Sequence, residues 1–131
     1  MMRLKSYSRR WLPLLIWMAL IFIVSHQPKE TIPAYGQWDL IVKKGGHVIA
    51  YGILAILARR AGFRERSALL LTFLYAVSDE FHQRFVPGRT GTVLDVFIDA
   101  LGATMSLLLL RHLPPYWRVA LLGQTIEPDE P

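Results

Sequence analysis

The chain has 131 residues, of which 53% are hydrophobic and only 19% charged, so it is more apolar than an ordinary soluble domain and is long enough for one domain. It has no cysteine, which excludes disulfides and thiolate metal sites. The net charge of +5 would suit nucleic acid if the basic side chains lined one polar face. They lie between apolar segments instead, so we predict no nucleic-acid partner.

Four apolar segments follow one another along the chain. A bilayer core of about 30 Å needs roughly 20 helical residues, so the third segment can span only if its helix continues through Asp79, Glu80 and Gln83. We therefore predict an all-α fold, a four-transmembrane-helix bundle in a single domain over 1–131. The expected spans are about 11–27, 41–58, 67–85 and 93–110.

Basic residues set the expected orientation. Ten of the fifteen lie before the first span, between the second and third, or after the fourth: Arg3, Lys5, Arg9, Arg10, Arg59, Arg60, Arg64, Arg66, Arg111 and Arg118. By the positive-inside rule, both termini and the 59–66 link are predicted to be cytoplasmic. A cleaved signal peptide is the alternative, but "SHQPKETIPAY" lacks the small residues of a cleavage site. After the fourth span, 116–124 is expected along the cytoplasmic interface and 125–131 as a frayed acidic tail.

Polar residues fall at matching heights in three of the spans. Counting about 1.5 Å per helical residue from the cytoplasmic arginines places His47, Glu80 and Asp99 roughly 18 to 21 Å up. Asp95 comes out higher. The sequence therefore predicts that ionisable groups from three helices lie at one level, in the outer half of the bilayer.

Helical spacing predicts which faces carry these groups. Glu80 and Gln83 are i,i+3, and Asp95, Asp99 and Gly102 follow i,i+4,i+7, so each set shares one face. Charged groups at this depth cost several kcal/mol unless they pair, hydrate or neutralise, so such faces point to the bundle interior and are candidate functional sites.

The link "VPGRTG" carries the expected partner of these acids. Pro87, Gly88 and Gly91 predict a tight outside turn. That turn is expected to fold Arg89 back over the carboxylates, where its planar guanidinium suits bidentate pairing.

Structural interpretations stand beside the functional ones. Thr92 to Asp95, "TVLD", is a plausible capping box that opens the fourth helix. His47 could merely begin the second helix near the headgroups, with the neighbouring lysines reaching to water. Tyr51 is expected to pack, with its hydroxyl hydrogen-bonded. Gly52 and Gly102 are expected to permit close helix approach. The whole cluster could be structural.

Two or more carboxylates in a low-dielectric pocket cannot all stay ionised, so an acid/base pair is the chemistry we expect. The candidate catalytic residues are His47, Glu80, Asp95 and Asp99, and the candidate substrate-binding residues are Asp79, Gln83 and Arg89. A divalent-metal site formed by His47 with Glu80, Asp95 or Asp99 is the weaker interpretation, because "DEFH" is not a His-Glu-x-x-His helix and no second histidine is well placed. A nucleophilic Ser78 is weaker still, because no nucleophile-elbow pattern surrounds it. We predict no metal and no cofactor.

The stretches "GGHVIAYGIL", "SDEFHQRFVPGR" and "DVFIDALGA" resemble the VanZ-like membrane proteins. That family's pattern is a His in the second span, Asp-Glu-x-x-Gln, Pro-x-Arg and Asp-x-x-x-Asn-x-x-Gly. It matches His47, Asp79, Glu80, Gln83, Pro87, Arg89, Asp95 and Gly102, while Asp99 replaces the usual Asn. The resemblance implies a multi-pass helical protein of the bacterial cytoplasmic (inner) membrane, in a family whose founding members are linked to teicoplanin resistance.

Three functions remain open at this point. The first is an outward-facing pocket that binds, or acts on, the polar head of a cell-envelope lipid or a lipid-linked glycopeptide. The second is a non-catalytic accessory module whose polar cluster is structural. The third is a proton-coupled carrier, which would require oligomerisation because four short spans hardly enclose a pathway.

Overall fold

The computed structural model describes residues 2–123, with side chains from residue 9 onward. The described residues form helices and turns, with no strand. The predicted frayed tail, 125–131, lies outside them. The elements in chain order are α1 (Met2–Ser25), the 3-10 turns Lys29–Thr31 and Gly36–Trp38, α2 (Asp39–Arg60), α3 (Glu65–Gln83), α4 (Val93–His112) and α5 (Pro115–Leu122).

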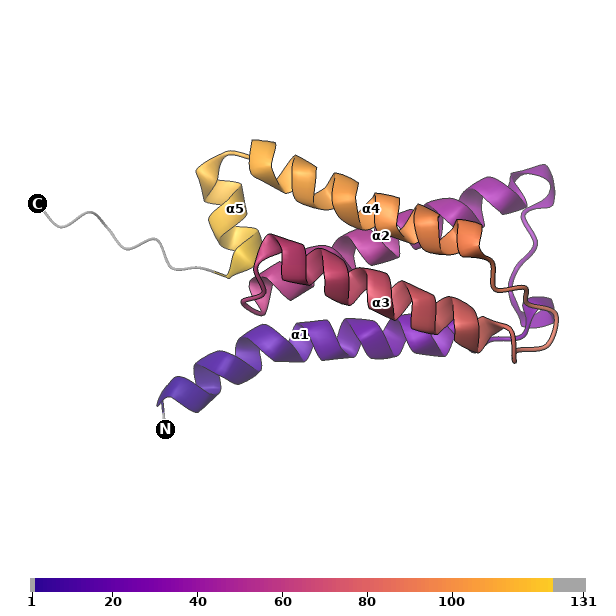
Figure 1. The fold of residues 1–131 in the computed structure, drawn as a ribbon, viewed down its shortest axis with the longest axis horizontal. Coiled ribbons are helices and arrows are strands. Elements are labelled where there is room, and N and C mark those ends of the chain that lie inside the picture. Colours follow the sequence, from indigo (N-terminus) through magenta and orange to yellow (C-terminus); the bar gives the residue numbers. More distant parts are fainter. Residues whose placement is uncertain (1, 124–131) are drawn as a thin grey trace, which may run out of the picture.

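The four long helices run alternately in opposite directions (Figure 1). The start of α1, the short α2–α3 link and α5 lie at one end, and the α1–α2 and α3–α4 links lie at the other. The two links at the second end are joined by a hydrogen bond from the Lys29 N–H to the Pro87 carbonyl, 3.3 Å long. This arrangement places the arginine-rich segments at one end of the molecule and the polar "VPGRTG" link at the other.

The helix ends follow from local sequence signals. α3 continues through Asp79, Glu80 and Gln83, as a spanning helix required. α4 begins at Val93 because Thr92 is extended and its hydroxyl accepts the backbone N–H of Asp95, as the capping pattern predicted. α5 begins at Pro115 and ends at Gly123, whose φ of +61° is the left-handed conformation that favours glycine.

α2 and α4 form the closest helix pair, and glycines permit it. A Cβ on Gly102 would lie 2.4 Å from the Val48 carbonyl oxygen, and one on Gly52 would lie 2.2 Å from Ser106 Oγ. Real side chains do not approach that closely. Both glycines therefore let the two backbones pack together, as expected from the sequence.

The exterior of the bundle is apolar while its interior carries charge. Large hydrophobic side chains are exposed along α1, α3 and α4, among them Leu15, Ile16, Ile23, Leu74, Leu101 and Leu109. Buried among the helices, by contrast, are Ser25, Thr72, Asp79, Glu80, Gln83 and Asp99. An inverted arrangement of this kind is typical of helices that face lipid.

Two stretches are long and apolar enough to cross a membrane. They are 36–60, with a mean hydropathy of 1.5, and Val93–His112, with 2.0. Together with the apolar exterior they support a helical membrane protein.

Candidate functional site

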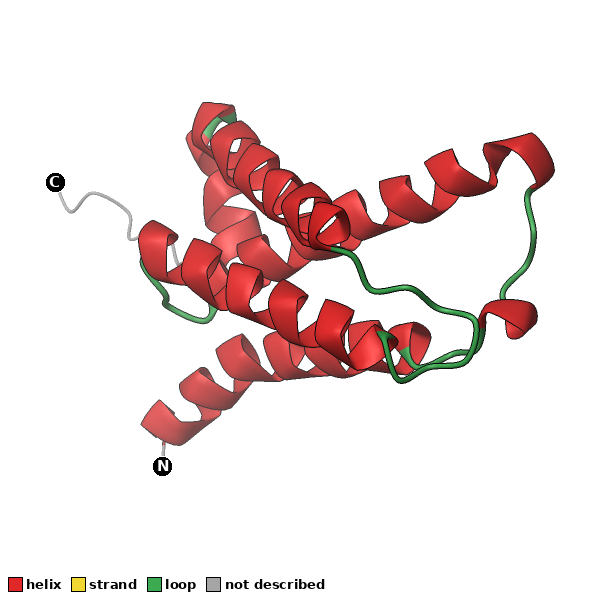
Figure 2. Cartoon of the chain, turned by 45° about the vertical axis from the view of Figure 1, so that its right-hand side comes forward, coloured by secondary structure: helices red, strands yellow, loops and turns green. Residues whose placement is uncertain are grey.

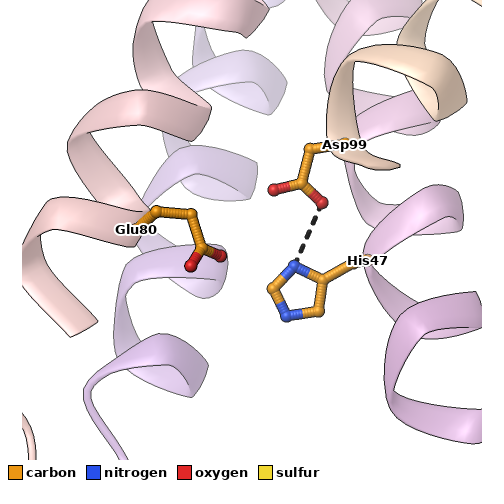
Figure 3. A group of neighbouring side chains, drawn as sticks. All are labelled: His47, Glu80 and Asp99. Carbon is orange, nitrogen blue, oxygen red and sulfur yellow. Dashed lines mark hydrogen bonds and ion pairs between the residues drawn. The ribbon is translucent and has the colours of Figure 1, made fainter. Parts of the chain in front are cut away.

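His47 of α2, Glu80 of α3 and Asp99 of α4 come together inside the bundle. One donor atom from each lies within 4.8 Å of the other two. His47 Nδ1 is 3.1 Å from Asp99 Oδ1, and the Glu80 carboxylate faces both across the gap between the helices (Figure 3). The prediction that these residues of three helices lie at one level is confirmed. With Asp79 and Gln83 they form what we call the polar cluster.

Asp79 joins three helices within the polar cluster. Its Oδ2 accepts hydrogen bonds from the Ser25 hydroxyl of α1 at 2.8 Å, the Tyr51 hydroxyl of α2 at 3.0 Å and the Gln83 amide of α3 at 3.1 Å. Asp79 is buried. Its carboxylate therefore holds α1, α2 and α3 in register around the site.

Glu80 is fixed by contacts at both of its oxygens. Oε1 accepts from the Gln83 amide at 3.2 Å, and Oε2 accepts from the backbone N–H of Thr92 at 3.1 Å. The second bond needs Gly91, because a Cβ there would lie 1.9 Å from the Glu80 carbonyl oxygen. Glu80 thus ties the α3–α4 link to α3 and remains directed at His47 and Asp99.

Asp95 lies one turn outside the polar cluster and is engaged elsewhere. It forms an ion pair with Lys44 of α2 and accepts a hydrogen bond of 2.7 Å from the Thr92 hydroxyl. It is only partly buried. These contacts give Asp95 the capping role that the sequence also allowed.

Arg89 folds back over the bundle as predicted, but its predicted pairing with carboxylates is wrong. Nη2 and Nε donate to the Val24 and Gln27 carbonyls, at 2.9 and 3.1 Å, and Nη1 donates to Gln83 Oε1 at 3.3 Å. The last carbonyls of a helix lack partners within the helix and attract cations, so the end of α1 competes successfully for the guanidinium. Partial burial lowers the pKa of Arg89, and Asp79 and Glu80 act in the opposite direction.

A groove of about 520 Å³ opens between α1 and α2 beside the polar cluster. Figure 2 shows the first turns of α2 leaning away from the other helices at this end. The walls of the groove are mainly apolar, and its polar lining side chains are Ser25, Tyr35, Lys43, His47, Tyr51 and Arg89. Its two walls are joined where Trp17 Nε1 donates to the Ala50 carbonyl at 2.8 Å.

Two contributors were missed by sequence reasoning. From the sequence, Ser25 is only the first residue of the polar stretch "SHQPKETIPAY", and Lys44 is one of the lysines expected to reach to water. Neither position carries a local signal, because each acquires its partner through helix packing. The structural interpretation of His47 is also wrong, because α2 begins at Asp39, two turns before it.

The arrangement offers two kinds of chemistry. The His47–Asp99 pair and Glu80 can move or hold protons, and the mixture of buried acids, amide and guanidinium can bind a polar group. The apolar walls of the groove lie directly beside the place where such a polar group would bind.

Comparison with known proteins was informative at the level of the family. The family model VanZ/LLP1 matches residues 10–114, which includes every residue of the polar cluster. No curated protein and no solved structure matches the chain. The match covers most of the sequence, and the chain belongs to the VanZ/LLP1 family.

Proposed function

We propose that this protein is a single-domain, four-span protein of the bacterial cytoplasmic membrane that binds the polar head of a cell-envelope lipid or lipid-linked glycopeptide. α1 and α3 join the two more apolar helices as spans, because both expose large hydrophobic side chains outward. Both termini and the 59–66 link are cytoplasmic, since the arginines gather at that end. The polar cluster then lies toward the outer surface.

The observation that carries the proposal is the junction between the groove and the polar cluster. The groove walls suit an acyl or prenyl chain, and His47 and Arg89 line the same cavity. An arginine is the usual partner of phosphate and carboxylate groups. The ligand class we propose is therefore an amphiphile with an anionic head and one or more hydrocarbon chains.

The residues of the site have different tasks in this proposal. His47 and Arg89 contact the head group. The carboxylates of Glu80 and Asp99 lie next to His47 and determine the charge around the bound head group. Asp79 and Gln83 position these groups by joining the helices. Asp95 caps the first turn of α4 and forms an ion pair with Lys44. We therefore do not assign it the catalytic role that the sequence suggested.

A second candidate function, acid/base chemistry on the bound head group, is favoured by the His47–Asp99 hydrogen bond. A carboxylate that orients an imidazole is the arrangement found where histidine transfers protons. Resistance to teicoplanin, which the family resemblance suggests, is the physiological setting we propose for either function.

Filling the groove tests the binding proposal. Gly46 lines the groove and has open space where a Cβ would be, so Gly46→Leu places its side chain in the cavity without a clash. Gly45→Leu is the matched control, because its Cβ position is also open but it does not line the groove. We expect mass spectrometry of lipids purified with each variant to show loss of one lipid class with Gly46→Leu only. Equal lipid content in both variants would contradict the proposal.

Removing the guanidinium tests the head-group contact. We expect Arg89→Ala to lose the same lipid class, whereas Arg84→Ala, an exposed arginine at the end of α3, should retain it. Arg89 also caps α1, so each variant is first checked for retained helix content and a single elution peak. A folded Arg89→Ala protein that keeps its full lipid complement would exclude Arg89 from binding.

A further inference from the structure

We propose that His47, Glu80 and Asp99 bind a divalent transition-metal ion of the Zn²⁺ type. This inference does not depend on lipid binding, and either proposal can fail without the other. From the sequence, a divalent-metal site at His47 was only the weaker interpretation, because no local metal-binding motif is present; the structure adds which carboxylates meet the imidazole.

The geometry of the three side chains suits one ion. Their donor atoms lie within 4.8 Å of one another and come from three different helices, which fixes them from three directions (Figure 3). Zinc binds imidazole nitrogen and carboxylate oxygen at about 2.0 to 2.2 Å, which places neighbouring donors roughly 3 to 3.5 Å apart. Small side-chain rotations would bring the three donors to these separations.

Asp99 supplies an observation independent of the grouping itself. Its side chain is 0% exposed, and its Oδ2 has no hydrogen-bond partner among the side chains that the structure describes, residues 9–123. In Figure 3 this second oxygen points into the space that separates Asp99 from Glu80. A buried acceptor without a partner is costly, and a cation held between the two carboxylates would satisfy it.

The charges around the site also call for a cation. Asp79, Glu80 and Asp99 are all buried. Of the two described cations that line the groove beside them, Lys43 pairs with Asp39, and Arg89 reaches the polar cluster at Gln83. A histidine that binds a metal is neutral and carboxylate ligands are deprotonated, so in the metal-bound site the three ionised carboxylates would exceed the charge of Arg89 by two. Uncompensated charge inside a membrane bundle is unfavourable, and a divalent ion supplies the missing two charges.

The donor set indicates the class of metal. One imidazole nitrogen with two carboxylate oxygens suits zinc, manganese or iron better than the soft ions that prefer sulfur. Three protein ligands leave at least one coordination position free. Because His47 also lines the groove, the proposed ion would lie beside it.

Zinc binding to the purified protein tests the proposal directly. We expect the full chain, stripped with EDTA in detergent, to bind one equivalent of Zn²⁺ by elemental analysis and to gain thermal stability on binding. Glu80→Gln and Asp99→Asn should each weaken binding by at least about tenfold, because each removes a charged ligand. Asp95→Asn is the matched control, one turn from Asp99 on the same helix, and should bind as the natural protein does.

Several results would overturn the metal site. One is a folded natural protein that takes up no Zn²⁺, Mn²⁺ or Co²⁺. Another is a loss of affinity with Asp95→Asn as large as that with Asp99→Asn, which would indicate general attraction to acidic side chains. If Asp99→Asn fails to fold, Glu80→Gln decides alone, and the visible spectrum of bound Co²⁺ reports whether a histidine nitrogen remains coordinated.

Discussion

Asp79 shows how a single buried carboxylate organises this membrane protein. Three donors from three helices converge on one of its oxygens, although its other oxygen, Oδ1, has no partner within the described part of the chain. A carboxylate removed from water needs such donors to remain in the interior. The bonds from Ser25 and Tyr51 are therefore structural contacts that also hold the walls of the groove together.

Removing one of these donors should destabilise the bundle measurably. We expect Tyr51→Phe to lower the free energy of unfolding by about 1 to 2 kcal/mol, because the Asp79 carboxylate loses a buried donor. Tyr75→Phe is the matched control. Its hydroxyl donates to the Met18 carbonyl at 2.6 Å, and a neutral acceptor should cost less to leave unpaired.

The measurement is denaturant unfolding of both variants in detergent micelles. A double-mutant cycle with Asp79→Asn isolates the Tyr51–Asp79 contribution. Equal losses for the two tyrosine variants, with no coupling to Asp79, would show that Tyr51 acts through packing alone.

Regular helices explain how much of the site the sequence predicts. Constant rise and rotation per residue place His47, Glu80 and Asp99 at one height on inward faces. In the structure their donor atoms lie within 4.8 Å of one another, with Glu80 and Asp99 buried and His47 partly buried. The link that carries Arg89 has no such periodicity. Its partners depend on where α1 ends, so the sequence predicted the fold-back but not the carbonyls it contacts.

The packing of the helices against one another is the feature that sequence patterns predict least well. The α1–α2 groove exists because α2 leans away from α1, and no residue pattern reports that angle. The α2–α4 contact is the exception, since Gly52 and Gly102 mark it in the sequence. This contact also places His47 beside Asp99, so the distance between α2 and α4 determines the distance between these two side chains.

Gly102→Ala should therefore disturb the α2–α4 contact more than Gly52→Ala. A methyl group at Gly102 meets the backbone of Val48 at 2.4 to 2.9 Å, which requires a backbone shift, whereas one at Gly52 meets chiefly the movable side chain of Ser106. We expect Gly102→Ala to cost about 1 to 3 kcal/mol and to weaken zinc binding, because it moves Asp99 away from His47.

Gly45→Ala is the control for this comparison. It lies in α2 with open space around its Cβ position, so it should be neutral or slightly stabilising through helix propensity. Thermal unfolding in detergent ranks the three variants. If the Gly102→Ala protein were as stable as the Gly45→Ala protein, α2 and α4 could move apart without a loss of stability, and the close contact would not be required.

Across the molecule, charge and polarity vary together along the bundle axis. Arginines gather at the end that carries the α2–α3 link, while the polar cluster and the groove lie toward the other end. By the positive-inside rule this asymmetry predicts the orientation in the membrane, and the orientation would decide from which side a ligand could reach the groove. A site that binds a cell-envelope ligand must open toward the outer surface. An experiment that determines the orientation of the helices therefore also tests the proposed function.

Single cysteines can report this topology cleanly because the natural chain has none. A thiol reagent that does not cross membranes should label cysteines in the outer links in intact cells, and should label the cytoplasmic ones only after the membrane is opened. Each chosen position is exposed, and each removed arginine leaves others in the same segment to keep the orientation. We expect labelling in intact cells at Thr31→Cys and Thr90→Cys, and protection at Arg9→Cys, Arg64→Cys and Arg118→Cys. Labelling of Arg64→Cys from outside would show that the protein has the opposite orientation, with the groove and the polar cluster toward the cytoplasm. That orientation is incompatible with an envelope ligand. The proposed metal site would not be affected by this result.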